Sequence, residues 1–214
     1  MLAAQAWLKG PGGDLVDPLM AEGRLVALAP GQWSHAEGDD DTGVLVVVEG
    51  ALQVFAQAPG DREVLINQVG AGAALGQTVR LGGGPRLTTA VSVGESLVLV
   101  VPDRSLGRIA ATRPHIWQAV ASLLYLQLRG LVQMAAEAAA LPPRQRLAAR
   151  LERLARGGDG TLGLTQQALA EMTGLSRKSV NAFLGEFARA GLVARTYGQV
   201  AVLDAAGLRK VAAG

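Results

Sequence analysis

Arg177, Lys178 and Asn181 are polar residues whose spacing places them on one side of a predicted helix. The opposite side consists of apolar residues at positions i, i+3, i+4 and i+7, which must face inward: Val180, Phe183, Leu184 and Phe187. An arginine can donate two hydrogen bonds to guanine, an asparagine can pair with adenine, and a lysine can reach a base or a phosphate. This side of the helix therefore suits the major groove of duplex DNA.

A shorter predicted helix precedes this one and completes a helix-turn-helix. Thr165 can cap a helix that runs to Met172, and Gly174 allows a tight turn. Ser176 can then cap the second helix, which runs to about Arg189. Hydroxyl, amide and free backbone N–H groups at the start of the first helix can hold phosphate.

A β-hairpin with a basic tip is predicted after Gly191. Its strands cover residues 192–194 and 199–203, and its tip runs from Arg195 to Gly198. An ordinary helical hairpin is the alternative for any helix-turn-helix pattern, but this added wing and the local positive charge favour DNA binding. The candidate DNA-binding residues are Thr165, Gln166, Gln167, Ser176, Arg177, Lys178, Ser179, Asn181 and Arg195.

The net charge of +2 hides an asymmetry along the chain. Residues 1–141 hold 9 basic and 13 acidic side chains, a net charge of −4, whereas residues 142–214 hold 11 and 5, a net charge of +6. The positive end is where a polyanion would bind. Taken alone, however, the arginines between 144 and 156 equally fit a solvated helix face.

Composition excludes several classes of protein. The chain has no cysteine, which excludes disulfides, iron–sulfur clusters held by cysteine, and cysteine nucleophiles. Its only histidines are His35 and His115, too few for the histidine and carboxylate cluster of a metal-dependent oxygenase. We therefore expect no enzyme, no catalytic residues and no metal site. The longest aliphatic stretch, residues 44–48, is too short to cross a bilayer, and the N-terminus lacks a signal pattern, so a cytoplasmic location is expected.

The N-terminal half is predicted to be an antiparallel sandwich or barrel. Between about residues 24 and 101, short apolar stretches alternate with glycine-containing turns. The predicted strands are Leu25–Ala29, Val44–Val48, Leu52–Ala56, Glu63–Val69, Thr88–Val93 and Leu97–Val101.

One long helix is predicted from His115 to Ala140, where the sequence has no proline and one glycine. Along it a heptad seam recurs at spacings of four and three, which predicts a parallel contact between two subunits. The seam residues are Trp117, Ala121, Leu124, Leu128, Leu131, Ala135 and Ala138. The alternative is a helix packed on its own barrel, but a second apolar set, Ile116, Val120 and Leu123, is available to face the barrel.

Pro142 and Pro143 mark a hinge after the long helix. A further helix is predicted from Arg144 to Arg156. The expected organisation is a sensor domain over residues 1–114, a dimerisation helix over 115–141, and a DNA-binding domain over 142–214.

Residues 169–181, LAEMTGLSRKSVN, resemble the DNA-binding signature of the CRP/FNR family of bacterial regulators. Residues 191–193 and 198–204 resemble the wing of that family. Further upstream, several segments resemble the glycine landmarks and the phosphate-site arginine of a cyclic-nucleotide-type β-roll: 28–32, 37–39, 48–50, 70–72 and 85–86. The resemblance implies an α+β fold: an N-terminal antiparallel β-roll of the double-stranded β-helix type, a long dimerisation helix and a C-terminal winged helix-turn-helix.

The resemblance also implies a homodimer that reads a two-fold symmetric site in double-stranded DNA and works with RNA polymerase. Lys178 stands where the family often has glutamate, and Ala182 where its second arginine is expected. The preferred half-site is therefore expected to differ from the best-known one.

The sensor half departs further from the nucleotide-binding members. Those members hold the ribose with a Gly-Glu pair, the cyclic phosphate with an Arg-Ser pair, and the base with hydroxyls on the long helix. Of these groups only the arginine is retained here, as Arg86. Binding of a cyclic nucleotide is therefore disfavoured, and two alternatives stay open: another small-molecule effector, or a pocket that binds nothing. The candidate effector residues are Gly76, Gln77, Arg86, Leu87, Thr88 and Leu131.

Two alternatives to an effector-regulated DNA-binding protein remain open. One is a regulator that needs no ligand because its pocket is degenerate. The other is a regulatory module whose terminal domain docks protein. Affinity that falls steeply with salt and depends on base sequence distinguishes the DNA reader from the docking module.

Overall fold

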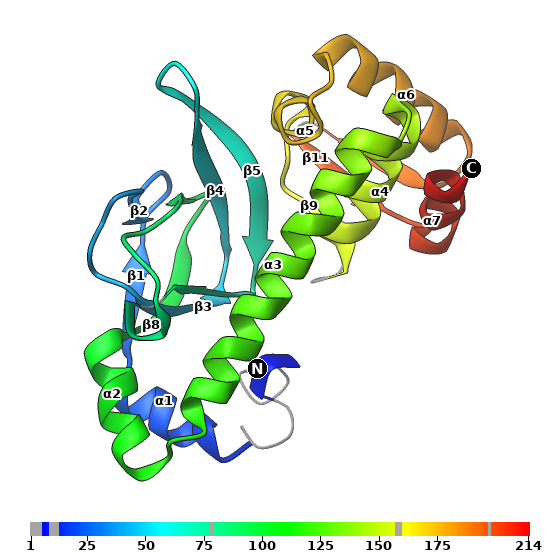
Figure 1. Ribbon diagram of the computed structural model, residues 1–214. Helices are drawn as coiled ribbons and strands as arrows, with labels where there is room; N and C mark the ends of the chain where they lie inside the picture. The colour runs from blue at the N-terminus through cyan, green and yellow to red at the C-terminus, as the bar shows by residue number, and fades with distance from the viewer. Residues whose placement is uncertain (1–5, 9–12, 78, 157–159, 197) are drawn as a thin grey trace. The chain divides into compact units, whose positions relative to one another are not determined.

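The computed structural model describes residues 6–8, 13–77, 79–156, 160–196 and 198–214 (Figure 1). They form two compact units. Unit 1 contains the residues up to Glu63 together with Gln68–Gly130, and unit 2 contains Val64–Asn67 and Leu131–Gly214.

Unit 1 holds the 3-10 helices Ala6–Leu8, Gly13–Leu15 and Val79–Leu81, the helices α1 (Val16–Glu22) and α2 (Asp103–Thr112), the start of α3 (Ile116–Ala140), and the strands β1 (Arg24–Leu28), β2 (Trp33–His35), β3 (Gly43–Glu49), β4 (Ala51–Ala58), most of β5 (Arg62–Gly70), β6 (Ala74–Gln77), β7 (Thr89–Ser92) and β8 (Ser96–Pro102). Unit 2 holds the middle of β5, the end of α3, α4 (Pro143–Ala155), β9 (Thr161–Leu162), α5 (Gln166–Thr173), α6 (Arg177–Arg189), β10 (Val193–Thr196), β11 (Gln199–Val202) and α7 (Ala205–Ala213).

The strands of unit 1 form two four-stranded sheets, in the orders β1-β8-β3-β6 and β2-β7-β4-β5. The pairing of β3 with both β6 and β8 is antiparallel, as is that of β7 with both β2 and β4. All six predicted strands are present within one or two residues of the expected bounds. The short strands β2 and β6 and the helices α1 and α2 were not predicted.

The aliphatic stretch at β3 is buried on both faces of its sheet. Leu45 and Val47 point into the β-roll, where they pack with residues of both sheets. Val44 and Val46 alternate with them and face the opposite side, toward the helices. This two-sided burial explains why β3 lacks the polar alternation of a surface strand.

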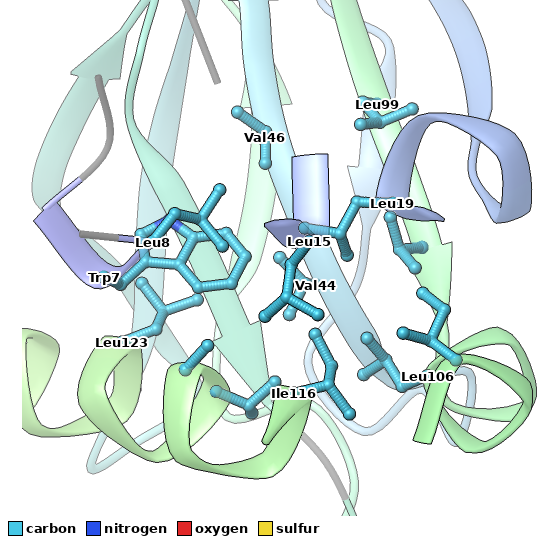
Figure 2. Packing of buried hydrophobic residues seen from close by; sticks show 14 residues of the cluster. Trp7, Leu8, Leu15, Leu19, Val44, Val46, Leu99, Leu106, Ile116 and Leu123 are labelled. Carbon is cyan, nitrogen blue, oxygen red and sulfur yellow. The ribbon is translucent and has the colours of Figure 1, made fainter. Parts of the chain in front are cut away.

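The second core of unit 1 lies between the sheet β1-β8-β3-β6 and the helices. Figure 2 shows Trp7, Leu8, Leu15 and Leu19 from the N-terminal segment gathered with Ile116 and Leu123 of α3. Ile116 and Val120 are fully buried and Leu123 nearly so, which confirms that this second apolar set faces the barrel.

The seam predicted on α3 is only partly free of its own unit. Trp117 and Leu124 are half-buried against the core of unit 1, so only part of each side chain is exposed to a partner, and the seam stays a prediction. The other seam residues are exposed: Ala121, Leu128, Leu131, Ala135 and Ala138. By length and composition α3 is also apolar enough to cross a bilayer, a weak signal that core helices of soluble proteins share.

Unit 2 is built on α4, α5, α6 and the sheet β10-β11-β9. Its core consists of side chains that are at most 3% exposed: Leu147, Leu151, Leu164, Leu169, Val180, Leu184, Phe187, Val193, Val200 and Leu208. Phe183, predicted to face inward with Val180 and Leu184, is only half-buried. Together the two units confirm the fold class: an antiparallel β-roll, a long helix and a winged helix-turn-helix.

Candidate nucleic-acid interface

Local hydrogen bonds fix both helices of the helix-turn-helix. The Thr165 hydroxyl accepts a hydrogen bond from the Ala168 amide (3.1 Å) at the start of α5, and the Ser176 hydroxyl accepts one from the Ser179 amide (3.0 Å) at the start of α6. Gly174 between them has φ +63°, a left-handed conformation that glycine adopts without steric cost. Both predicted caps and the predicted turn are confirmed, and α5 runs one residue further than expected, to Thr173.

Arg177, Lys178 and Asn181 are exposed on α6, opposite the buried Val180 and Leu184. Ser176 is also exposed, whereas Ser179 is half-buried with its hydroxyl 2.8 Å from that of Ser176. The two serines therefore act locally as a cap, and the charged and amide groups form the outer face of the helix.

A groove in unit 2 runs between the start of α5, the start of α6 and the wing. It brings together five of the predicted residues, Thr165, Gln166, Gln167, Arg177 and Arg195. Three residues of the predicted wing that were not among the candidate DNA-binding residues also line it: Thr196, Gly198 and Gln199. Gln199 is a polar residue in the sequence, but only the fold shows that the start of β11, where it lies, borders the groove.

Asn181 links the three parts of the motif. Its Oδ1 accepts a hydrogen bond from the Arg195 guanidinium of β10 (2.6 Å), and the Gln166 side-chain amide of α5 donates to the same oxygen at 3.3 Å. The wing, the recognition helix and the preceding helix therefore meet at one carboxamide.

Most arginines of α4 form ion pairs or hydrogen bonds with other residues of unit 2. These contacts reduce the positive charge that α4 offers to a polyanion. Arg144 pairs with Glu186, and Arg153 pairs with Glu137. Arg150 is buried and donates to the Ile66 carbonyl and to Asn67. Among the described residues, α6 and the wing still expose cations around the groove: Arg177, Lys178 and Arg195.

Glu152 of α4 ties the end of the chain to this helix. Its carboxylate is only 5% exposed and accepts hydrogen bonds from Arg156 and from Arg209 of α7. Burial alone would raise the pKa of Glu152, but these hydrogen bonds and charges outweigh burial and lower the pKa. The carboxylate stays ionised and holds α7 on α4.

In unit 1, Arg86 lies buried against the loop that precedes β3. Its Nε donates to the Asp41 carbonyl (3.1 Å), and its backbone pairs with Gly38 and Asp39. Burial lowers the pKa of Arg86, and the carboxylates around it oppose that shift. Beside it, burial and the positive charge of Arg86 lower the pKa of His35 to about 4, so this imidazole is neutral at pH 7.

The other candidate effector residues have different surroundings. Leu87 is 73% exposed, and Thr88 is half-buried. Leu131 is 49% exposed and belongs to unit 2. Gln77 ends β6, and its side chain lies outside the described residues.

Gly76 of β6 is held by α3. The Gln127 side chain accepts a hydrogen bond from the Gly76 amide (2.7 Å) and donates one to the Gly76 carbonyl (3.1 Å). A Cβ at Gly76 would come within 2.7 Å of the Leu123 side chain, so a larger residue here would require the buried Leu123 side chain to shift. Sequence reasoning missed Gln127, although it is a polar residue in an otherwise apolar stretch of helix.

Two family models match separate parts of the chain. Residues 25–113 match the cyclic nucleotide-binding domain, and residues 145–211 match the Crp-like helix-turn-helix domain. The chain belongs to the CRP/FNR family of transcription regulators. This regulator therefore binds DNA through its helix-turn-helix and carries a cyclic-nucleotide-binding-like domain.

Named relatives agree with the family. The regulator is 26% identical to the CRP-like cAMP-activated global transcriptional regulator of Mycobacterium tuberculosis, over 90% of each chain. It is 29% identical to the cyclic AMP receptor protein of Thermus thermophilus, over 83% of each chain. The structure of FixK2 from Bradyrhizobium japonicum shares the fold, with a TM-score of 0.78 and 16% identity, over 90% of this chain and 98% of that one.

Proposed function

We propose that this regulator acts as a homodimer and reads a two-fold symmetric operator with α6 of each subunit in the major groove. The observation that carries the proposal is the exposed face of Arg177, Lys178 and Asn181 beside the groove of unit 2. Thr165, Gln166 and Gln167 border that groove at the start of α5, where free amides and polar side chains suit a phosphate.

The dimer is supported by the exposed apolar surface of α3. Tyr125, Leu128, Leu131 and Val132 are each between 49% and 63% exposed in the single chain. A contiguous surface of this kind on one helix fits a coiled contact with a second copy of the chain.

We further propose that the regulator contacts RNA polymerase and acts in the cytoplasm of a bacterium.

Arg177→Ala tests whether the exposed side of α6 that carries Arg177, Lys178 and Asn181, here called the reading face, contacts bases. We expect roughly 5- to 150-fold weaker binding to the selected operator and a relaxed base preference at one position of each half-site, because a bidentate arginine–guanine contact is lost. Fluorescence anisotropy on operators with single base changes measures both quantities. Arg189→Ala, at the far end of α6, is the control, and it should weaken binding to all sequences alike. Undiminished discrimination by Arg177→Ala would remove this residue from the reading face.

For the sensor domain we propose a small-molecule effector other than cyclic AMP, with Arg86 as its polar contact. The two curated relatives are described as cAMP-activated or as cyclic AMP receptors. In this regulator, however, the side chains of Leu87 and Leu131 contain no group that can donate or accept a hydrogen bond. Each polar edge of a buried ligand that is left unpaired costs about 1 to 3 kcal/mol.

A thermal-shift screen of the purified protein tests the effector proposal. Cyclic AMP, cyclic GMP and inorganic phosphate are suitable probes, together with small organic anions. We expect no saturable rise in Tm with cyclic AMP and a saturable rise with another anion, because a ligand that binds only the folded state stabilises it. A saturable rise with cyclic AMP would overturn the proposal.

The second candidate is a regulator that needs no effector. The observation that favours it is the pair of hydrogen bonds between Gln127 and the Gly76 backbone, by which the protein's own residues join α3 to β6. A screen in which none of the probes raises Tm would favour this candidate.

A further inference from the structure

A guanidinium group from the wing lies on the outer face of the recognition helix. Arg195 of β10 donates from Nη2 to Asn181 Oδ1 at 2.6 Å. A Cβ built on Gly185 would lie 3.5 Å from Arg195 Nη1. Because Asn181 and Gly185 are one helical turn apart, the guanidinium spans that turn of α6.

The sequence of α6 leaves room for this guanidinium. Lys178, Asn181, Ala182 and Gly185 follow the spacing i, i+3, i+4 and i+7, so they form one stripe on the helix. Ala182 adds only a methyl group to the stripe, and Gly185 adds nothing. The wing therefore supplies the functional group that these two positions lack.

The hydrogen bonds at Asn181 decide what this surface can recognise. A carboxamide oxygen has two lone pairs, and here Arg195 and Gln166 both donate to Asn181 Oδ1. The amide nitrogen of Asn181 can still donate. Pairing with adenine requires an asparagine to accept from the base as well as donate to it, so this carboxamide lacks the acceptor that adenine needs.

We propose that Arg195 and Asn181 act as one base-reading unit that presents only donors and selects guanine in the major groove. Guanine offers two acceptors there, N7 and O6, and no donor. Arg195 is thus a specificity-determining residue, rather than a wing cation that contacts phosphate and carries no sequence information. The inference rests on the proposed function, because it requires α6 to lie in the major groove.

The test compares the wild type with Arg195→Ala, Arg195→Lys, Asn181→Ala and the double variant on the selected operator. Each protein is also measured on operators in which single guanines are replaced by adenine. Arg195→Ala should weaken binding to the operator roughly 5- to 150-fold and abolish the preference at one guanine of each half-site. Arg195→Lys should restore non-specific binding and its salt dependence but not that preference, because an ammonium lacks the planar fork.

The double variant measures coupling between the two residues. If they act as a unit, the losses from Asn181→Ala and Arg195→Ala should not add, because either change alone breaks the shared contact. Lys210→Ala, an exposed cation of α7, is the matched control and should leave every base preference unchanged. Both tested residues are exposed, and circular dichroism checks that the variants fold.

A phosphate role for Arg195 would give a different pattern: equal loss on all sequences, full rescue by Arg195→Lys, and additive effects. That pattern overturns the base-reading unit and leaves the proposed function intact, provided that the wild type discriminates and Arg177→Ala does not. If the wild type selects no sequence at all, the proposed function itself fails.

Discussion

Replacing Leu131 by glutamate is expected to convert the protein from dimer to monomer. The proposed contact would bring this residue of both subunits into one apolar seam, and an unpaired carboxylate buried there is strongly destabilising. A monomer engages one half-site at a time, so affinity for the two-fold operator should fall roughly 100- to 10,000-fold. Sedimentation velocity measures the assembly, and anisotropy with the full operator measures the affinity.

Leu131 suits this experiment better than Leu124. Leu131 is 49% exposed in the single chain, so a charge there leaves the fold of the subunit undisturbed. Leu124 is half-buried against the core of unit 1, so a glutamate would destabilise the subunit as well as the seam.

Gln133→Glu is the control for added charge. It places the same carboxylate on an exposed position of α3 away from the seam, where dimerisation should persist. If Leu131→Glu sediments as an unaltered dimer, α3 does not join the subunits through this seam.

Phe187→Ala is expected to lower the free energy of unfolding of unit 2 by about 3 to 5 kcal/mol. Phe187 lies on the buried side of α6 and is fully buried, and the Arg144 guanidinium lies 5.4 Å from the centroid of its ring. Truncation leaves a cavity and removes this cation–π contact. Operator binding should be lost with the folded helix-turn-helix.

All three tryptophans, Trp7, Trp33 and Trp117, belong to unit 1, so their fluorescence does not report on unit 2. Hydrogen exchange of peptides from α5 and α6 measures the effect directly. Leu203→Ala is the matched control, because this leucine is 64% exposed and its truncation should change stability by no more than about 0.5 kcal/mol. Equal protection of α6 in wild type and Phe187→Ala would show that Phe187 does not hold this helix in place.

The helix-turn-helix could be predicted from sequence because its signals are local. Thr165 and Ser176 cap helices that begin at the next residue, and Gly174 supplies the left-handed turn between them. The apolar spacing from Val180 to Phe187 then fixes which side of α6 is exposed. None of these features depends on a distant part of the chain.

The missed elements depend on distant partners. β2 has only three residues, and it is a strand because it pairs with β7, more than fifty residues further along the chain. β6 is short and contains Gly76, so its sequence alone indicates a turn. It is a strand because it pairs with β3. Short strands of this kind are defined by their ladder rather than by their own sequence.

Long-range contacts also decided which candidate residues are available to a ligand. The contact between Asn181 and Arg195 exists only because the hairpin folds back on α6. The arginines of α4 formed a basic cluster in the sequence, yet Arg144 and Arg153 form ion pairs and Arg150 is buried. Net charge alone therefore overstated the surface that unit 2 offers to DNA.

The decisive experiment for DNA reading by α6 is selection from a pool of random double-stranded oligonucleotides with the intact protein at moderate ionic strength. We expect enrichment of a two-fold symmetric sequence whose half-sites contain guanine and lie about one helical turn apart. A pool that stays random after repeated rounds would contradict it.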